Sequence, residues 1–271
     1  MPILPRLVSL YEKRGIQIST GLNPSHFSNY PLAPFTWFIS EGKSLTNGLG
    51  ISLQEIYFLE CLFARFHPRR LFVIGNSAGW STLALALANP LATVLAIDAG
   101  FDTRSLEGID FTNGIAKEEG LRVRVVKGIS PTEVGDIVWG QGTEPIDFAF
   151  IDGLHTVEQI EKDFDAIRAT ASSDCVYLFH DVETCKLHQG IERIHAKSGL
   201  TWHLLLGTTS GMVIMHGGEA PPTWLSDIAP FQARPVALDL IHDSAWSHRH
   251  RHLARWRRSV RKRLAKFQPS S

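Results

Sequence analysis

The sequence predicts an α/β protein with a Rossmann-like, doubly wound sheet that is mostly parallel and ends in a C-terminal antiparallel hairpin. Short apolar runs alternate with segments of helical period from about residue 52 to residue 199. That alternation is typical of a parallel sheet with helices on both faces. The pattern then changes: TWHLLLGTTSGMVIMHG (201–217) holds two apolar runs around GTTSG. No crossover helix fits between them, so these two strands must pair antiparallel.

Each element follows from its local sequence. SLQEIYFLECLFARF (52–66) opens with the capping-box pair Ser52 and Glu55, and HTVEQIEKDFDAIRA (155–169) with the pair Thr156 and Gln159. The expected strands are RRLFVIG (69–75), LATVLAID (91–98), LRVRVVKG (121–128), IDFAFID (146–152) and CVYLFHD (175–181). The other expected helices are GWSTLALALAN (79–89), FTNGIAKEEG (111–120), PTEVGDIVW (131–139) and IERIHAKSG (191–199).

The domain organisation follows from composition. Residues 1–50, which include LNPSHFSNYPLAPFTWF, lack periodicity and are expected to form an irregular N-terminal cap or lid. Residues 51–217 form the α/β domain, and residues 218–271 a C-terminal extension. In the cap, Lys43 and Thr46 are candidates to touch a ligand, although a plain loop is the stronger reading. A chain that is 44% hydrophobic and 20% charged suits one large globular domain with extensions.

The net charge of zero hides a basic tail. Residues 248–266 carry nine Lys or Arg and no acid, so the rest of the chain is acidic. The tail, residues 246–267, has apolar residues at helical spacing: Leu253, Trp256, Val260, Leu264 and Phe267. Such a helix fits a peripheral contact with the inner face of a membrane or with an anionic polymer. Equally, it fits a helix packed on its own acidic body.

The sequence also indicates the compartment and excludes some partners. Three cysteines without disulfide or metal spacing, no signal peptide and no long apolar stretch lead us to expect a cytoplasmic protein. Because the body of the chain is acidic, a nucleic-acid substrate is unexpected. A homodimer is open, and nothing in the sequence shows one.

The turn VIGNSAGWST (73–82) has the composition of a nucleoside-binding loop. Gly75 and Gly79 allow a tight turn at a helix N-terminus, and Asp98 ends the next strand, where a carboxylate can accept ribose hydroxyls. The spacing G-x-x-x-G matches neither the dinucleotide fingerprint nor a P-loop. The alternative is a plain strand–helix turn with Asp98 capping a loop.

These motifs resemble class I S-adenosylmethionine-dependent methyltransferases, with their seven-stranded sheet. Within that class the chain is similar to small-molecule O-methyltransferases, the group that includes catechol O-methyltransferase and bacterial sugar and macrolide O-methyltransferases. The resemblance covers about Leu53 to His216. It implies S-adenosyl-L-methionine as cofactor, held by the side chains or backbone of Gly75, Ser77, Gly79, Ser81, Asp98, Ser130 and Asp152. The chain departs from the pattern at Val73, where relatives usually carry an acid that holds the cofactor's amino group.

A second group of polar residues follows two strands. Asp152 and His155 come after IDFAFI, and His180 and Asp181 after CVYLF. The carboxyl ends of parallel strands share one edge of a sheet, where ligands bind. Oxygen ligands with some imidazole suit Mg²⁺, Mn²⁺ or a similar divalent ion. Structural alternatives remain: Asp152 or His155 as a helix cap, His180 and Asp181 as a buried pair. Glu183 is either a further ligand or, in the stronger reading, a solvated helix start.

The resemblance assigns roles at this edge. It implies metal ligands at Asp152, His180 and Asp181, with His155 as general base at the position of the lysine in catechol O-methyltransferase. IDGLH resembles the IDGDH of bacterial relatives, with Leu154 in place of the second aspartate. The expected activity is methyl transfer to a hydroxyl of a small molecule or glycan. Two alternatives stay open: a metal-independent methyltransferase and an inactive cofactor-binding adaptor recruited through its basic tail.

Overall fold

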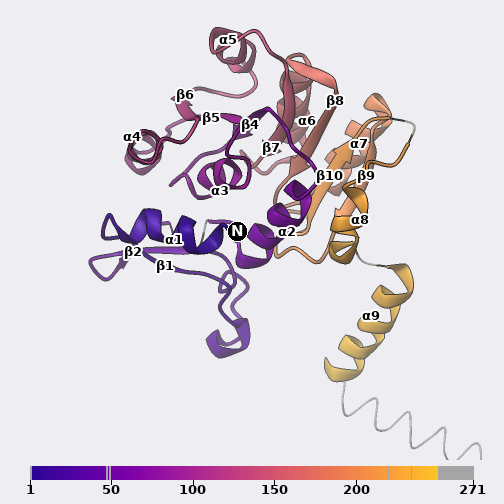
Figure 1. Ribbon diagram of the computed structural model, residues 1–271. Coiled ribbons are helices and arrows are strands. Elements are labelled where there is room, and N and C mark those ends of the chain that lie inside the picture. The colour runs from indigo at the N-terminus through magenta and orange to yellow at the C-terminus, as the bar shows by residue number, and fades with distance from the viewer. Residues whose placement is uncertain (1, 47, 49, 219, 233, 250–271) are drawn as a thin grey trace, which may run out of the picture. The chain divides into compact units, whose positions relative to one another are not determined.

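The computed structural model describes residues 2–46, 48, 50–218, 220–232 and 234–249, and the chain divides into two compact units, residues 1–232 and 233–271. The first unit is built on a seven-stranded sheet in the order β6-β5-β4-β7-β8-β10-β9 (Figure 1). Its strands are β4 (Arg70–Ile74), β5 (Thr93–Asp98), β6 (Val123–Lys127), β7 (Ile146–Ile151), β8 (Ala171–Phe179), β9 (Thr201–Leu205) and β10 (Met212–His216).

The strand directions confirm the predicted fold. Strands β4 to β8 pair in parallel. Strand β10 pairs antiparallel with both β8 and β9, as the hairpin predicts. The order turns back between β4 and β7: the chain moves outward through β5 and β6, then returns to β7 on the other side of β4. In doubly wound sheets such a switch point is where ligands bind, outside the carboxyl ends of the strands.

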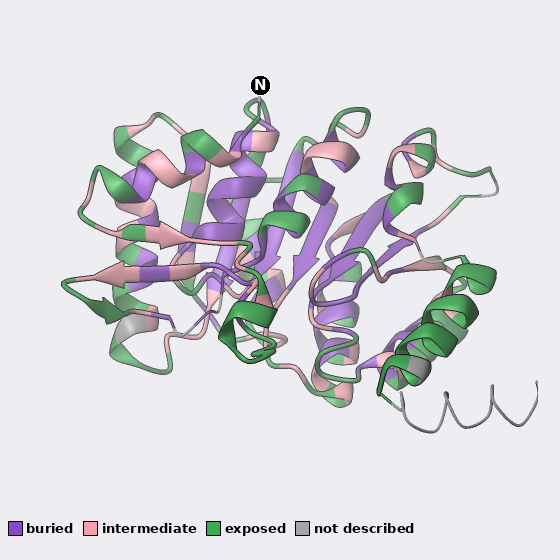
Figure 2. Cartoon of the chain, turned by 90° about the horizontal axis from the view of Figure 1, so that it is seen from below, coloured by how far each residue is buried: buried purple, intermediate pink, exposed green. Residues whose placement is uncertain are grey.

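Helices cover both faces of the sheet (Figure 2), and β4 and β10 are buried along their whole length, whereas the edge strands β6 and β9 are only partly buried. Val73 and Phe150 pack toward α2 (Leu53–Phe63), α3 (Trp80–Ala88) and α4 (Thr103–Glu118). Their neighbours Phe72 and Ala149 pack toward α5 (Val134–Gly140), α6 (Val157–Arg168) and α7 (His188–Ser198). Successive side chains of a strand point to opposite faces, so an apolar run with no alternation is what a sheet covered on both faces requires.

The first 50 residues are more regular than the sequence predicts. They contain α1 (Leu4–Glu12), the short 3-10 helix η1 (Pro24–Phe27) and an antiparallel sheet of β1 (Gln17–Ser19), β2 (Trp37–Ser40) and β3 (Lys43–Ser44). Tyr11 anchors this cap: its ring lies 5.2 Å from that of Phe38 and 5.3 Å from that of Trp80, and its hydroxyl donates to Ala78 O. These strands are too short to show an alternation of apolar and polar residues in the sequence. They can therefore be recognised only in the tertiary structure.

Part of the predicted C-terminal extension belongs to the first unit. The short helices α8 (Leu225–Ile228) and η2 (Ala229–Phe231) bury Trp224, Ile228 and Phe231, and Phe231 packs edge-on against Phe58 of α2. The second unit contains α9 (Pro235–Arg249). The predicted amphipathic tail from Leu253 to Phe267 lies outside the described residues. Among the residues that are described, no helix has the length and apolar character to cross a membrane.

Candidate active site

The glycine turn lies between β4 and α3, and its conformation requires both glycines. Gly75 has φ +92°, and a Cβ there would lie 2.0 Å from the backbone oxygen of Asp152. Gly79 has φ +84°, caps the N-terminus of α3 and leaves no room for a side chain beside Thr112. Both angles fall in the left-handed region that side chains disfavour. The turn therefore brings backbone close to the end of β7, where Asp152 stands.

Asp98 shapes this turn directly. Its Oδ2 accepts the backbone N–H groups of Asn76 at 3.0 Å and Ser77 at 2.8 Å, and its Oδ1 accepts that of Gly100 at 2.9 Å. Ser77 has φ +45°, an uncommon angle for a residue with a side chain. A carboxylate that accepts charge-assisted bonds from two neighbouring amides stabilises such a turn. Asp98 therefore stabilises the glycine turn, next to which it was predicted to accept ribose hydroxyls.

Two other predicted cofactor residues lie in different surroundings. Ser81 is buried in the first turn of α3, only 7% exposed. Ser130 follows β6, but its hydroxyl donates to Asp163 of α6 and its backbone oxygen accepts from the Gln159 side chain at 3.1 Å. Thr156 caps α6 as predicted, whereas the Gln159 side chain bonds Ser130 and Asp163. The Ser130 loop is therefore tied to α6.

The polar residues that follow β7 and β8 form one cluster. Asp152, His155, His180 and Asp181 each offer a ligand atom, and these four atoms lie within 4.8 Å of one another. His155 Nε2 is 3.1 Å from Asp152 Oδ1 and 3.5 Å from Asp181 Oδ2. His180 Nδ1 is 3.2 Å from each of the same two oxygens. Two carboxylate oxygens thus stand between two imidazoles.

Glu55 is a further member of this site that the sequence did not nominate. Its side chain is fully buried, and its Oε1 lies 3.4 Å from His180 Nε2. The sequence identified Glu55 as a capping-box residue, and that prediction is confirmed, since Ser52 and Glu55 bond reciprocally. The capping box accounts for one carboxylate oxygen of Glu55. Nothing in the sequence shows that the other oxygen faces His180, at the end of a buried strand.

The electrostatics of the cluster favour a cation. Burial by itself would lower the pKa of His180, but the charges of Asp152 and Glu55 outweigh it and hold that pKa well above its ordinary value. Burial would raise the pKa of Asp181, but the hydrogen bond and charge of His180 lower it to about 2. Burial would likewise raise the pKa of Asp152, but the charges and hydrogen bonds of the neighbouring histidines lower it. Three carboxylates around one buried imidazole therefore attract positive charge.

A divalent ion fits the donor set of this cluster. Both ring nitrogens of His180 are buried without an aligned hydrogen-bond partner, although carboxylate oxygens lie 3.2–3.4 Å away. Two carboxylates and two imidazoles are ligand types that divalent metals accept. Asp181 has φ +54°, in the left-handed region that aspartate enters more readily than most residues with a side chain. Glu183 instead pairs with His188 at the surface, at 3.1 Å.

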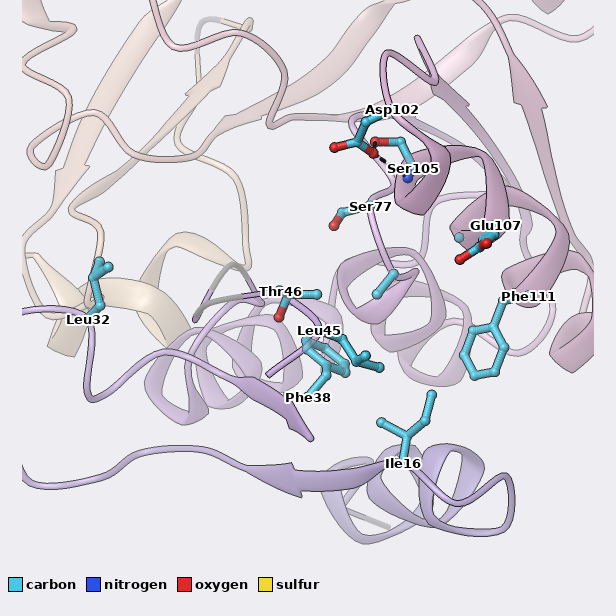
Figure 3. Close-up of a pocket in the computed structure, with 12 residues that line it drawn as sticks. Ile16, Leu32, Phe38, Leu45, Thr46, Ser77, Asp102, Ser105, Glu107 and Phe111 are labelled. Carbon is cyan, nitrogen blue, oxygen red and sulfur yellow. Dashed lines mark hydrogen bonds between the residues drawn. The ribbon is translucent and has the colours of Figure 1, made fainter. Parts of the chain in front are cut away.

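A cavity of about 580 Å³ lies between the N-terminal cap and the glycine turn (Figure 3). Ile16, Phe38, Leu45 and Phe111 give it apolar walls, while Thr46, Ser77 and Ser105 add hydroxyls. Of the two cap residues nominated from the sequence, Thr46 lines this cavity and Lys43 is not among the lining residues. A volume of this size is typical of small-molecule sites.

A family model matches the part of the chain that holds the glycine turn and the polar cluster. Residues 72–182 match the family described as a methyltransferase domain. Residues 72–182 are therefore similar to a methyltransferase domain. The match spans the glycine turn, Asp98 and the whole Asp152–Asp181 cluster. Together with the seven-stranded sheet, it confirms the resemblance to class I S-adenosylmethionine-dependent methyltransferases. No curated protein matches the sequence significantly.

Solved structures share the fold of the methyltransferase domain. One is a Staphylococcus aureus protein provisionally named caffeoyl-CoA O-methyltransferase (TM-score 0.52, 15% identity, covering 62% of this chain and 85% of that one). Another is the O-methyltransferase TomG from Streptomyces achromogenes, involved in tomaymycin synthesis and solved with S-adenosylmethionine (0.50, 20%, 63% and 83%). A third is a methyltransferase from Geobacter sulfurreducens (0.50, 14%, 80% and 88%).

Proposed function

We propose that this protein is an S-adenosylmethionine-dependent O-methyltransferase that methylates a hydroxyl of a small molecule or glycan, assisted by a divalent metal ion. One observation carries the proposal: Asp152 belongs to both sites. Its backbone oxygen packs against Gly75 of the cofactor turn, and its carboxylate lies 3.1 Å from His155 and 3.2 Å from His180. A methyl donor on the turn and an acceptor at the cluster would meet at this residue.

The cofactor would lie over the glycine turn. Gly75, Ser77 and Gly79 provide a close backbone approach, and Ser81 follows in the first turn of α3. Asp98 already accepts three backbone N–H groups, and its two oxygens have further lone pairs for ribose hydroxyls. Ser130 would approach the adenine through its backbone, since its hydroxyl is bonded to Asp163. The cofactor bound in TomG supports this assignment by analogy of fold.

Asp152, His180 and Asp181 are the residues that would hold the ion. A divalent ion supplies charge that orients a hydroxyl and favours its ionised form. The two carboxylates provide oxygen ligands, and His180 provides an imidazole nitrogen that faces them at 3.2 Å. Because the chain buries these groups at one strand edge, their attraction for a cation is stronger than it would be in water.

His155 would act as the general base. Burial would lower its pKa, but the hydrogen bond to Asp152 and the charges of Asp152 and Asp181 raise it. With Nε2–H donated to Asp152, the lone pair of Nδ1 takes the acceptor proton. The acceptor oxygen then bonds the methyl carbon as the carbon–sulfur bond breaks, and S-adenosylhomocysteine leaves. At 31% exposure, the His155 side chain is accessible to an acceptor.

A metal-independent reaction is the second candidate, favoured by the direct pairing of His155 with Asp152. A carboxylate that orients a histidine makes a general base without an ion, as in the catalytic triads of hydrolases. In that case the buried His180 would remain protonated and itself provide the positive charge beside Asp152 and Asp181. The two candidates make opposite predictions for a chelator.

The test is a calorimetric titration of the full chain with S-adenosylhomocysteine, with Mg²⁺ and then with chelator, followed by labelled methyl transfer to a panel of catechols and sugars. We expect micromolar binding and transfer that chelator abolishes. Binding with chelator-resistant transfer would select the metal-independent reaction. Absence of binding in both conditions would contradict the proposal and favour the adaptor alternative, in which Val73 marks a lost cofactor site.

A further inference from the structure

The buried carboxylate of Glu55 touches three parts of the chain that the sequence keeps far apart. From the N-terminus of α2, its Oε2 accepts the backbone N–H of Ser52 at 2.7 Å. Its Oε1 accepts the backbone N–H of Ser210 at 2.9 Å and the Ser210 hydroxyl, and it lies 3.4 Å from His180 Nε2. An ionised carboxylate with no exposure must be compensated in this way, because removing it from water is costly.

Ser210 connects this carboxylate to the cluster by a second route. It lies in the loop between β9 and β10, and its backbone oxygen accepts the N–H groups of Glu183 at 3.2 Å and Thr184 at 3.3 Å. Those two residues follow Asp181, and the Thr184 hydroxyl donates to the Asp181 carboxylate. The hairpin loop therefore bonds both to Glu55 and to the segment that carries Asp181.

His180 is fixed from its other sides by aromatic rings. Phe35 of the cap and Phe150 of β7 pack edge-on against the imidazole, with ring centroids 6.5 Å and 5.9 Å from its own. These contacts restrict where the ring can lie, but they do not decide which nitrogen carries the hydrogen. That choice depends on the polar neighbours of each nitrogen, and the carboxylate oxygen beside Nε2 is Glu55 Oε1, at 3.4 Å.

We propose that Glu55 is a positioning residue of the cluster, which holds the Nε2 side of His180 so that Nδ1 is presented to an ion bound by Asp152 and Asp181. The inference rests on the metal-assisted form of the proposed function. A neutral imidazole carries one N–H and one lone pair, and a carboxylate that accepts the N–H leaves the lone pair on the other nitrogen. Histidines that bind metals commonly have such a partner, which orients the ring and strengthens the ligand.

The experiment measures Mn²⁺ binding to the full chain by calorimetry, and the visible absorption spectrum of the Co²⁺ complex, for wild type, Glu55→Gln and Ser52→Ala. Glu55→Gln keeps the shape of the side chain but removes its charge. Ser52→Ala is the matched control: it removes the Ser52 hydroxyl, which accepts from Glu55 N and bonds the Thr209 hydroxyl, and it leaves the Glu55 carboxylate in place.

We expect Glu55→Gln to raise the Mn²⁺ dissociation constant about 10- to 100-fold and to alter the Co²⁺ spectrum. Ser52→Ala should leave the constant within about threefold, although we expect both variants to lower thermal stability. If Glu55→Gln fails to fold, Ser210→Ala, which removes one hydrogen bond to Oε1, should give a smaller rise in the same direction.

Three outcomes would overturn the inference. Glu55→Gln could bind Mn²⁺ as tightly as wild type, with an unchanged Co²⁺ spectrum. Both variants could weaken Mn²⁺ equally, which would reduce Glu55 to a structural cap. Failure of wild type to bind either ion would remove the metal from the proposed function and this inference with it. Titration with S-adenosylhomocysteine reports separately on the methyltransferase assignment.

Discussion

The edge of the sheet at the carboxyl ends of its strands has two halves, the glycine turn beside β4 and β5 and the polar cluster beside β7 and β8. These halves satisfy their polar groups in different ways. On the β4–β5 side, Asp98 accepts three backbone N–H groups, and the side chain of Asn76 bonds Thr82 and Thr112. On the β7–β8 side, both ring nitrogens of His180 lack an aligned partner although three carboxylates surround them. The first half is a completed backbone scaffold, whereas the second is a concentration of negative charge that favours a cation.

This difference teaches where each half is vulnerable. A scaffold of backbone turns depends on conformation, so it should respond most to a side chain that does not fit. A charge cluster depends on ionisation, so it should respond most to pH, metal and neutral substitutes. Gly75 and Asp152 connect the halves, because the turn packs against the strand end that carries the carboxylate.

The largest effect is expected from Gly75→Ala. The new Cβ would lie 2.0 Å from Asp152 O at a φ of +92°, so both halves must shift. We expect loss of S-adenosylhomocysteine binding in calorimetry and a loss of unfolding free energy of about 4 kcal/mol. The control is Gly114→Ala in α4, where no atom lies within 4 Å of the added carbon. Wild-type binding by Gly75→Ala would show that the turn is not the cofactor site.

His155→Gln tests the cluster without touching the turn. Methyl transfer should fall about 10²- to 10⁴-fold while S-adenosylhomocysteine affinity stays within about twofold. In wild type the base must be neutral, and the carboxylates raise its pKa. The rate should therefore increase as pH rises through a value above about 6.5, the ordinary histidine pKa. A rate that His155→Gln leaves unchanged would reassign the base.

Asp98→Asn should weaken the turn by an intermediate amount. The amide retains one oxygen and loses the charge, so at least one of the three accepted N–H bonds is broken. A hydrogen bond to a charged group contributes about 1.5–3 kcal/mol, so we expect roughly 10- to 100-fold weaker cofactor binding. Calorimetry at several Mg²⁺ concentrations measures it. Independence from Mg²⁺ would separate the two halves, whereas dependence would show them coupled.

The smallest effect is a pH dependence of stability in the chelated protein. The pKa of Asp181 is lowered to about 2 because of His180, despite burial. A lowered pKa contributes stability above the unfolded value, about 3.9, and this contribution is lost as pH falls through about 2. Urea unfolding should show a loss of about 2 kcal/mol that Asp181→Asn no longer shows. The exposed Asp174→Asn should retain it; equal behaviour of both variants would contradict the assignment.

Much of the fold followed from patterns that local chemistry produces. Uninterrupted apolar runs such as FVI and FAFI mark strands covered on both faces, and the absence of a linker helix after Thr201 marks the hairpin. Ser52 and Thr156 cap their helices because a hydroxyl can satisfy a nearby N–H whatever the tertiary structure. The strand-end positions of Asp152, His155, His180 and Asp181 followed from the same strand pattern.

The errors of the sequence reading have one cause in common. The cap contains α1 and three short strands because Tyr11 packs between Phe38 and Trp80, and residues 224–231 join the first unit because Phe231 packs against Phe58. Gln159 reaches Ser130 and Asp163 because β6 brings that loop beside α6. Some of these contacts join segments that are distant in sequence. Others depend on which of several nearby groups a side chain bonds.

Within residues 51–217 the sequence by itself determined the succession of strands and helices, the glycine positions and the residue types at the strand ends, because these depend on neighbours a few positions away. Only the tertiary structure decided that the four polar side chains converge within 4.8 Å, that Asp98 bonds its own turn, and that Glu55 reaches His180 from α2. Glu55 and His180 are 125 positions apart in the sequence, and no local sequence pattern indicates a contact between residues so far apart. Packing of α2 and the hairpin loop against the sheet brings them together.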